Sequence, residues 1–137
     1  MAQAGYSKRT LVQKLGIKEG WSVAFLNVPP DYMATLGELP TGVEVQEDVI
    51  ADIDFVQLFV SERGVLEAEF PQVKDNLSRD GMLWVSWPKR AAKMETDLDE
   101  NVVREIGLGN GLVDVKVIAV DEVWSGLKFV RRLRDRT

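Results

Sequence analysis

Two cations and two aromatic side chains stand near the ends of predicted strands, where they could bind a ligand. Lys89 and Arg90 follow a buried strand, and both can pair with a phosphate or carboxylate, Arg90 as a planar fork and Lys89 as a point charge. Trp87 and Trp124 could form a stacking platform for a base or another ring. This combination indicates a binding site for an anionic small molecule.

Each of these residues also has a structural interpretation. Lys89 and Arg90 could instead cap carbonyls or pair with Asp121 and Glu122, and the tryptophan rings could close the end of the core. Asp121 and Glu122 are adjacent, so on a strand they would point to opposite faces and make a poor acid–base pair. We therefore name candidate ligand-binding residues and no catalytic residue. The candidates are Asn27, Ser61, Trp87, Lys89, Arg90, Asp121 and Trp124.

The composition narrows the chemistry further. The 137 residues include no histidine and no cysteine. Serine–histidine and cysteine–histidine nucleophile pairs, thiolate zinc sites and imidazole acid–base catalysis are therefore excluded. Any reaction must depend on carboxylates, Lys, Arg, hydroxyl groups, an oxygen-ligated metal or a cofactor, and no metal site is predicted.

The charge distribution bears on partners. A net charge of −5 makes a nucleic-acid partner an unfavourable interpretation. Every charged residue in the range 38–54 is acidic, whereas residues 128–136 are mostly basic. These segments are either solvated surface or partner-binding edges, and the basic C-terminal hairpin could pair with the acidic segment of a second copy. A protein partner or a homo-oligomer is therefore possible.

No membrane partner is expected. The sequence has no apolar run of the length that a membrane span needs, and its first nine residues lack the apolar stretch of a secretory signal. We therefore expect a cytoplasmic protein.

Strands alternate with helices along the chain. Buried apolar runs predict strands at 21–28, 43–47, 55–60, 82–87, 113–120 and 127–133. Helical spacing and capping residues predict helices at 8–15, 32–37, 62–77 and 100–108, with Pro71 kinking or dividing the third. Ser7, Asp31 and either Thr96 or Asp99 are the expected helix caps. Turns are expected at 79–81 and at 124–126.

This alternation predicts one α/β domain over residues 1–137. It is a three-layer, Rossmann-like domain with a mostly parallel sheet of about six strands that ends in an antiparallel hairpin. In such sheets ligands bind beyond the carboxyl ends of the strands, near the point where the strand order reverses. Asn27 and Ser61 follow the two strands expected to flank that point.

The order of elements resembles the class I methyltransferase fold. The segments 15–23 (LGIKEGWSV) and 80–85 (DGMLWV) look like the approaches to two strands of that family. The resemblance implies a reduced sheet with the order 2-1-3-4-6-5. The family holds S-adenosylmethionine at a glycine-rich turn after the first strand, but here residues 27–31 contain two prolines and no glycine. S-adenosylmethionine is therefore disfavoured, although Glu47 or Asp48 could match the family's ribose-binding carboxylate.

A second resemblance covers nearly the whole chain. The segments 4–7, 87–90, 96–98, 111–114 and 121–127 look like a family of small bacterial proteins grouped as domain of unknown function 3052. That family implies no established activity. The sequence therefore predicts a non-catalytic ligand- or partner-binding domain with a degenerate methyltransferase-like fold. The alternative is a group-transfer enzyme that acts on a nucleotide-like or phosphorylated small molecule at the carboxyl-end cleft.

Overall fold

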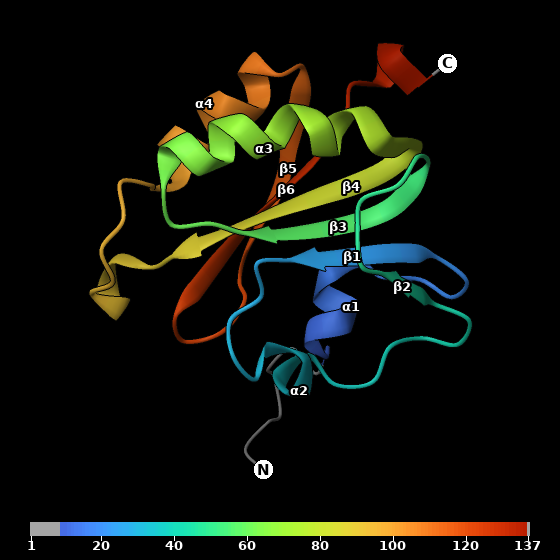
Figure 1. Ribbon diagram of the computed structural model, residues 1–137, viewed down its shortest axis with the longest axis horizontal. Helices are drawn as coiled ribbons and strands as arrows, with labels where there is room; N and C mark the ends of the chain where they lie inside the picture. Colours follow the sequence, from blue (N-terminus) through green and yellow to red (C-terminus); the bar gives the residue numbers. More distant parts are fainter. Residues whose placement is uncertain (1–8, 137) are drawn as a thin grey trace.

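Six strands form one sheet in the computed structural model, which describes residues 9–136 (Figure 1). The strands are β1 (Ser22–Leu26), β2 (Glu44–Gln46), β3 (Ile53–Phe59), β4 (Leu77–Pro88), β5 (Leu112–Ala119) and β6 (Trp124–Arg131). The helices are α1 (Leu11–Leu15), α2 (Tyr32–Leu36), α3 (Arg63–Asn76) and α4 (Glu100–Gly109), with short 3₁₀ turns η1 (Arg90–Ala92) and η2 (Leu133–Arg136).

The sheet has the order β2-β1-β3-β4-β6-β5. Strands β2, β1, β3 and β4 pair in parallel, whereas β6 lies antiparallel between β4 and β5. This topology confirms the predicted fold class and the predicted strand order. Because β5 runs in the direction of the parallel strands, the β5–β6 turn lies at their carboxyl edge.

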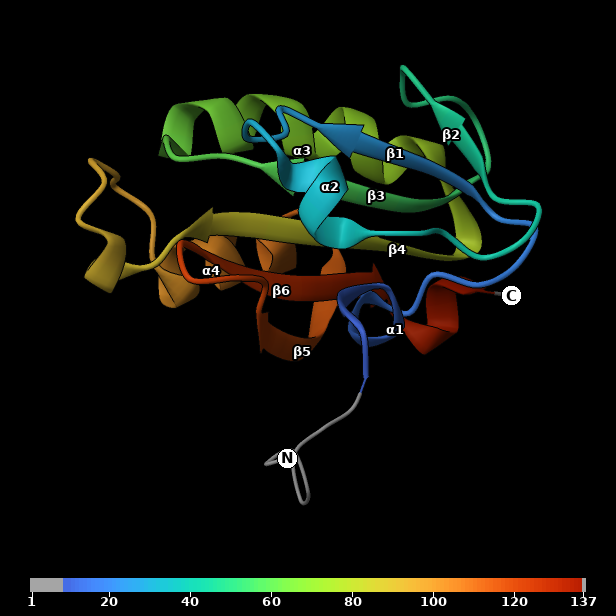
Figure 2. The ribbon, with the colours of Figure 1, turned by 90° about the horizontal axis from the view of Figure 1, so that it is seen from below.

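Helices cover both faces of the sheet. Figures 1 and 2 show α3 and α4 on one face and α1 and α2 on the other. The α3–α4 side buries Leu66, Phe70 and Phe129, and the α1–α2 side buries Leu15 and Trp84 in a second cluster. Every central strand is thus covered by helices on both of its faces, which explains its nearly continuous apolar sequence.

The beginnings of the helices differ in part from the predictions. Ser7 lies outside the described residues, and Thr10 caps α1 in a reciprocal capping box with Gln13. Asp31 precedes α2 but makes no side-chain cap hydrogen bond, because its backbone is left-handed. Asp99 caps α4 as predicted, by accepting a hydrogen bond from the Val102 N–H at 2.9 Å.

Both expected turns are wrong. Residues 79–81 belong to β4, which begins directly after α3, and their extra length appears as a register shift against β3. Residues 124–126 belong to β6, where Ser125 lies opposite Trp87 and Gly126 opposite Ser86. The turn is formed instead by Asp121, whose Oδ1 accepts the N–H groups of Val123 and Trp124. Pro71 lies inside α3 without dividing it.

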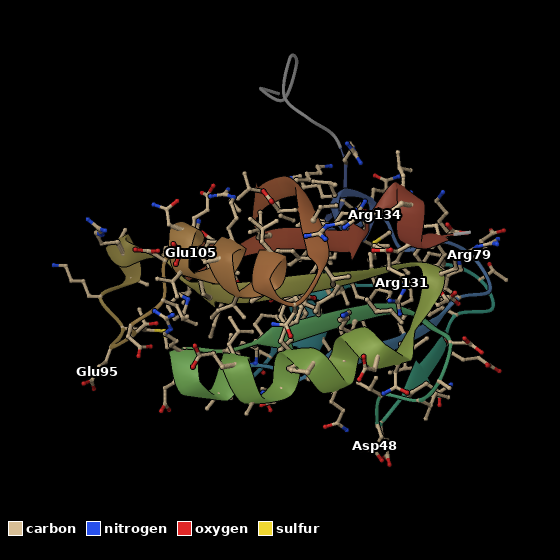
Figure 3. The ribbon with its side chains drawn as sticks, turned by 90° about the horizontal axis from the view of Figure 1, so that it is seen from above. Asp48, Arg79, Glu95, Glu105, Arg131 and Arg134 are labelled. Atoms are coloured by element: carbon tan, nitrogen blue, oxygen red, sulfur yellow. The ribbon has the colours of Figure 1, made fainter. Side chains whose placement is uncertain are left out.

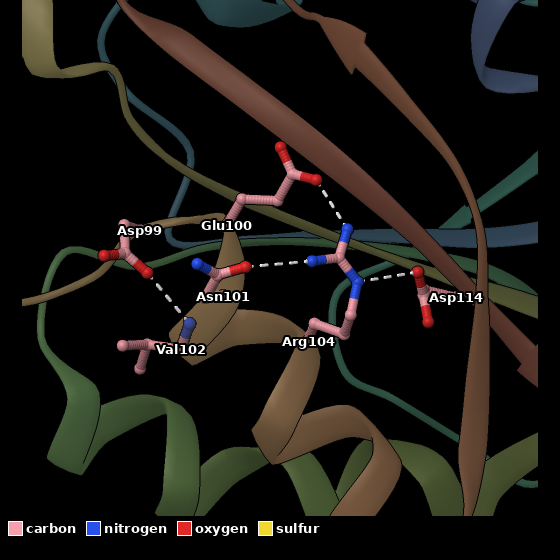
Figure 4. Close-up of polar contacts among 6 residues, drawn as sticks. All are labelled: Asp99, Glu100, Asn101, Val102, Arg104 and Asp114. Carbon is pink, nitrogen blue, oxygen red and sulfur yellow. Dashed lines mark hydrogen bonds and ion pairs between the residues drawn. The ribbon is translucent and has the colours of Figure 1, made fainter.

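Arg104 holds α4 against the edge strand. Its Nε donates to Asp114 on β5 at 2.9 Å, and its terminal nitrogens donate to Glu100 and Asn101 (Figure 4). Asp114 is thereby engaged on the α4 side of the sheet.

The basic C-terminus is partly engaged within the chain. Arg131 donates to the carbonyls of Lys74 and Leu77, each at 2.8 Å, at the end of α3. Figure 3 shows Arg131 and Arg134 at the opposite end of the sheet from Glu95. The predicted pairing of this basic segment with a second copy remains a prediction.

No helix within residues 9–136 is both long and apolar enough to cross a membrane.

Candidate functional site

Three adjoining hollows follow the carboxyl edge of the sheet. The first, about 250 Å³, lies between the ends of β1 and β3, and the second, about 590 Å³, shares Ser61 and Glu62 with it. The third, about 370 Å³, shares Thr96 and Asp97 with the second. We call this row the carboxyl-edge groove. Its lining residues are Asn27, Phe59, Val60, Ser61, Glu62, Val65, Trp87, Pro88, Arg90, Met94, Glu95, Thr96, Asp97, Leu98, Asp99 and Trp124.

The loop between β4 and α4 forms one wall of the groove and is fastened to the β3–α3 connection. Thr96 Oγ1 donates to the Ser61 carbonyl at 2.5 Å and accepts the Leu98 N–H at 3.1 Å. Asp97 Oδ1 accepts the Arg63 N–H at 2.7 Å. These contacts fix the distance between the two walls.

Asn27 closes the end of the groove at the point where the strand order reverses. Its Nδ2 donates to the Phe59 carbonyl at 3.3 Å, so the side chain bridges the ends of β1 and β3. Its φ of 58° is left-handed, as is that of Asp31 at 65°. Between them lie Pro29 and Pro30, which have no N–H to offer a ligand.

Aromatic rings pack behind this end of the groove. Trp124 meets Phe59 edge to face with ring centres 5.2 Å apart, and Tyr32 meets Phe59 at 4.7 Å. The Tyr32 hydroxyl donates to Gln57 Oε1 at 2.7 Å, and Gln57 Nε2 donates to Ser86 Oγ at 3.1 Å. Burial raises the pKa of Tyr32 well above its usual value; the hydrogen bond to Gln57 opposes this rise and the charge of Asp121 adds to it.

Trp87 and Trp124 do not share a platform. Trp87 is buried in the cluster on the α3–α4 side, whereas Trp124 packs against the cluster on the α1–α2 side. The register explains this, because Trp124 lies opposite Pro88 and therefore one position away from Trp87. The stacking interpretation that needed both rings is wrong, while each ring separately borders a hollow.

The remaining candidates are divided between the groove and its rim. Arg90 lines the third hollow, and Ser61 lines the first two. Lys89 lies at the rim, where its N–H donates to the Val123 carbonyl at 2.7 Å. Asp121 forms the β5–β6 turn described above. Within residues 9–136 neither Lys89 nor Arg90 forms an ion pair with Asp121 or Glu122, so the expected pairing is wrong.

The groove is more acidic than the candidate residues indicated. Glu62, Glu95, Asp97 and Asp99 line it, with Arg90 as a cation beside them. The sequence indicated Thr96 only as a helix cap and Glu62 only as the first residue of a helix. It gave no signal for Glu95, because a polar loop has no periodicity that reveals which way it faces. Among the described residues, no group of three or more acidic side chains is arranged to hold a metal ion.

Solved structures with a similar fold include methyltransferases. A SAM-dependent methyltransferase from Aquifex aeolicus matches with a TM-score of 0.59 at 17% identity, over 87% of this chain and 86% of the other. Magnesium protoporphyrin IX methyltransferase from Synechocystis PCC 6803, with bound SAM, matches with a TM-score of 0.57 at 12% identity, over 89% of this chain and 74% of the other. The fibrillarin pre-rRNA processing protein of Methanococcus jannaschii matches with a TM-score of 0.53 at 11% identity, over 83% of this chain and 67% of the other.

No family model and no curated protein sequence matches the chain. Membership in the bacterial family indicated by the sequence therefore remains a prediction. The likeness to solved structures establishes the fold alone: this chain has a six-stranded, Rossmann-like fold of the methyltransferase type.

Proposed function

We propose that this chain is a non-catalytic binding domain that keeps the methyltransferase-like fold without its cofactor site. The observation that carries the proposal is the Asn27–Phe59 hydrogen bond beside a turn that contains Pro29 and Pro30. A nucleotide-like cofactor in such a fold needs close approach to backbone N–H groups after the first strand. Here two of those residues have no N–H, and a side chain bridges the gap between β1 and β3.

The polar groups of the groove support binding rather than turnover. Thr96, Asp97 and Asp99 are all hydrogen-bonded to backbone groups of this chain, so their role is to hold the walls. Glu62 and Glu95 form no hydrogen bond or ion pair through their side chains within residues 9–136. They are therefore available to a ligand.

The side chains that remain available indicate the ligand's chemistry. Arg90 can pair with a carboxylate or phosphate, and Glu62 and Glu95 can accept hydrogen bonds from ammonium or hydroxyl groups. A ligand with an anionic group and a nearby donor group, or a partner segment with the same two features, matches this arrangement. The anionic group is the part expected from the sequence.

The proposal is tested by a ligand panel. Thermal unfolding would be followed with S-adenosylmethionine, nucleotides, phosphorylated metabolites and amino acids. We expect S-adenosylmethionine to leave the melting temperature unchanged, and a ligand that carries an anionic group and a nearby donor group to raise it. Arg90→Gln and Glu62→Gln should reduce this rise. Arg79→Gln, at the opposite end of the sheet, should not reduce it. A ligand that is converted to product, with conversion abolished by Lys89→Ala in a folded protein, would contradict the proposal.

The alternative of a group-transfer enzyme has the fold likeness as its support. It required an open pocket lined jointly by Trp87, Lys89 and Trp124. None of the three hollows of the carboxyl-edge groove is lined by all three residues. We therefore favour the binding domain.

A further inference from the structure

Two lysines face each other across the terminal hairpin. Lys116 of β5 lies directly opposite Lys128 of β6, on the face that α1 and α2 cover in part. Like charges in this position destabilise a sheet. Side chains directly opposite one another begin about 5 Å apart at Cβ, so both ammonium groups can reach one small anion.

Lys128 is also constrained on its other side. It lies opposite Trp84, a fully buried residue of β4, and is itself half-buried. Burial lowers the pKa of the Lys128 ammonium, and the positive charges of Lys116 and Lys18 lower it further. We call the paired Lys116 and Lys128 the lysine cluster.

Within residues 9–136, no carboxylate forms an ion pair with either lysine of this cluster. Asp114, two residues from Lys116, is held on the other face of the sheet by Arg104. Two half-buried lysines with no ion-pair partner among the described residues are a cost to folding that an external anion would offset.

We propose that the lysine cluster binds one multiply charged oxyanion, such as the phosphate group of a small phosphorylated ligand. Two ammonium groups can share the oxygens of a single phosphate, as point charges without a fixed plane. The net charge of −5 gives anions no general attraction to the protein, so the cluster provides the local field that a specific site needs.

This site is separate from the carboxyl-edge groove. Lys128 lies four residues along β6 from Trp124, or roughly 13 Å at the rise of a strand. The groove has carboxylates along its walls, whereas the lysine cluster has cations alone. The inference therefore does not depend on the proposed function.

The test uses inorganic phosphate and inorganic pyrophosphate as probes, each against sodium chloride of equal ionic strength. At ten times the dissociation constant, we expect the melting temperature of the wild type to rise by about 5 °C. Lys128→Gln and Lys116→Gln should abolish the rise, while Lys93→Gln, an exposed lysine beyond η1, should keep it. Amide resonances of β5 and β6 should shift on titration, and those of residues 95–97 should not.

Other results would overturn the proposal. An equal rise in Lys128→Gln and Lys116→Gln would place the anion elsewhere, and an equal rise in sodium chloride would show ionic screening alone. Circular dichroism should be used to check that each variant is folded. If Lys128→Gln does not fold, Lys116→Gln provides the test. A phosphorylated ligand that shifts the groove amides instead would contradict the site and leave the proposed function standing.

Discussion

Asp97 caps a helix that begins 34 residues before it in the chain. Its Oδ1 accepts the Arg63 N–H at 2.7 Å, whereas Glu62, the residue at the N-cap position of α3, makes no cap hydrogen bond through its side chain. The loop between β4 and α4 thereby satisfies a donor at the start of α3. One contact serves both the helix and the wall of the carboxyl-edge groove.

Removing this cap should weaken both the start of α3 and its attachment to the wall of the carboxyl-edge groove. We expect Asp97→Ala to lower the free energy of unfolding by about 1 kcal/mol, the usual value for loss of an N-cap. Asp80→Ala, which removes an exposed ion pair with Arg79, is the control and should change stability by less than about 0.5 kcal/mol. Urea denaturation measures both variants. Equal effects would show that the Asp97 contact does not stabilise α3.

The contact of α4 with the sheet depends on Gly107. A Cβ at this position would lie 2.0 Å from Cε1 of Phe129, which is fully buried, whereas a Cβ at Gly109 in the last turn of the same helix meets nothing within 4 Å. Gly107→Ala should therefore destabilise the protein by about 1–3 kcal/mol through overpacking. Gly109→Ala should be neutral or stabilise it by up to about 1 kcal/mol. Thermal unfolding of the pair tests this, and a stable Gly107→Ala would refute the packing.

Tyr32 should make the protein sensitive to alkaline pH. Its folded-state pKa is raised, chiefly by burial. Below the usual tyrosine pKa of about 10 both states keep the proton, but above it the unfolded state loses the proton first. The free energy of unfolding should therefore fall as pH rises beyond about 10. Urea unfolding at several pH values would show the fall in the wild type and a smaller one in Tyr32→Phe.

The same variant tests the buried chain of hydrogen bonds at neutral pH. Tyr32→Phe leaves Gln57 Oε1 buried without its donor, which should cost about 1–3 kcal/mol. Changing Gln57 to Met and Ser86 to Ala as well should recover part of that loss, because neither Gln57 Oε1 nor Ser86 Oγ then remains as an orphaned acceptor. Identical alkaline behaviour of Tyr32→Phe and the wild type would show that Tyr32 does not cause the pH dependence.

The lysine cluster makes a prediction about stability without any ligand. Lys128→Met keeps the length of the side chain and removes its charge from opposite Lys116, so it should raise the free energy of unfolding by about 0.2–1 kcal/mol at pH 7. Lys93→Met, in an exposed position, should change it little. Denaturation in low salt measures the difference. A destabilised Lys128→Met would mean that the ammonium is already compensated within the chain.

The sequence alone was sufficient for the fold because its signals are local. Apolar runs such as 82–87 marked the central strands, and the Asp99 cap marked α4. The strand order followed from the alternation of strands and helices together with the methyltransferase resemblance. Ser125 and Gly126 misled the prediction, since they are typical turn residues but lie in β6, where Gly126 leaves room for the Trp84 ring.

The site was less predictable because it depends on register and loop direction. Trp87 and Trp124 both follow the expected strands, yet a register offset of one position places them on opposite faces. Asp97 gains its role from a contact across 34 residues. No pattern in the 89–99 loop shows that its carboxylates face the end of β3.

We propose that this chain keeps the methyltransferase-like fold without the cofactor site. The decisive measurement is a calorimetric titration of S-adenosylmethionine into the folded wild-type protein. Because Asn27 bridges β1 and β3 beside Pro29 and Pro30, we predict no saturable heat up to the millimolar range. Saturable binding of one S-adenosylmethionine per chain, weakened by a substitution of Asn27 that leaves the protein folded, would contradict the account.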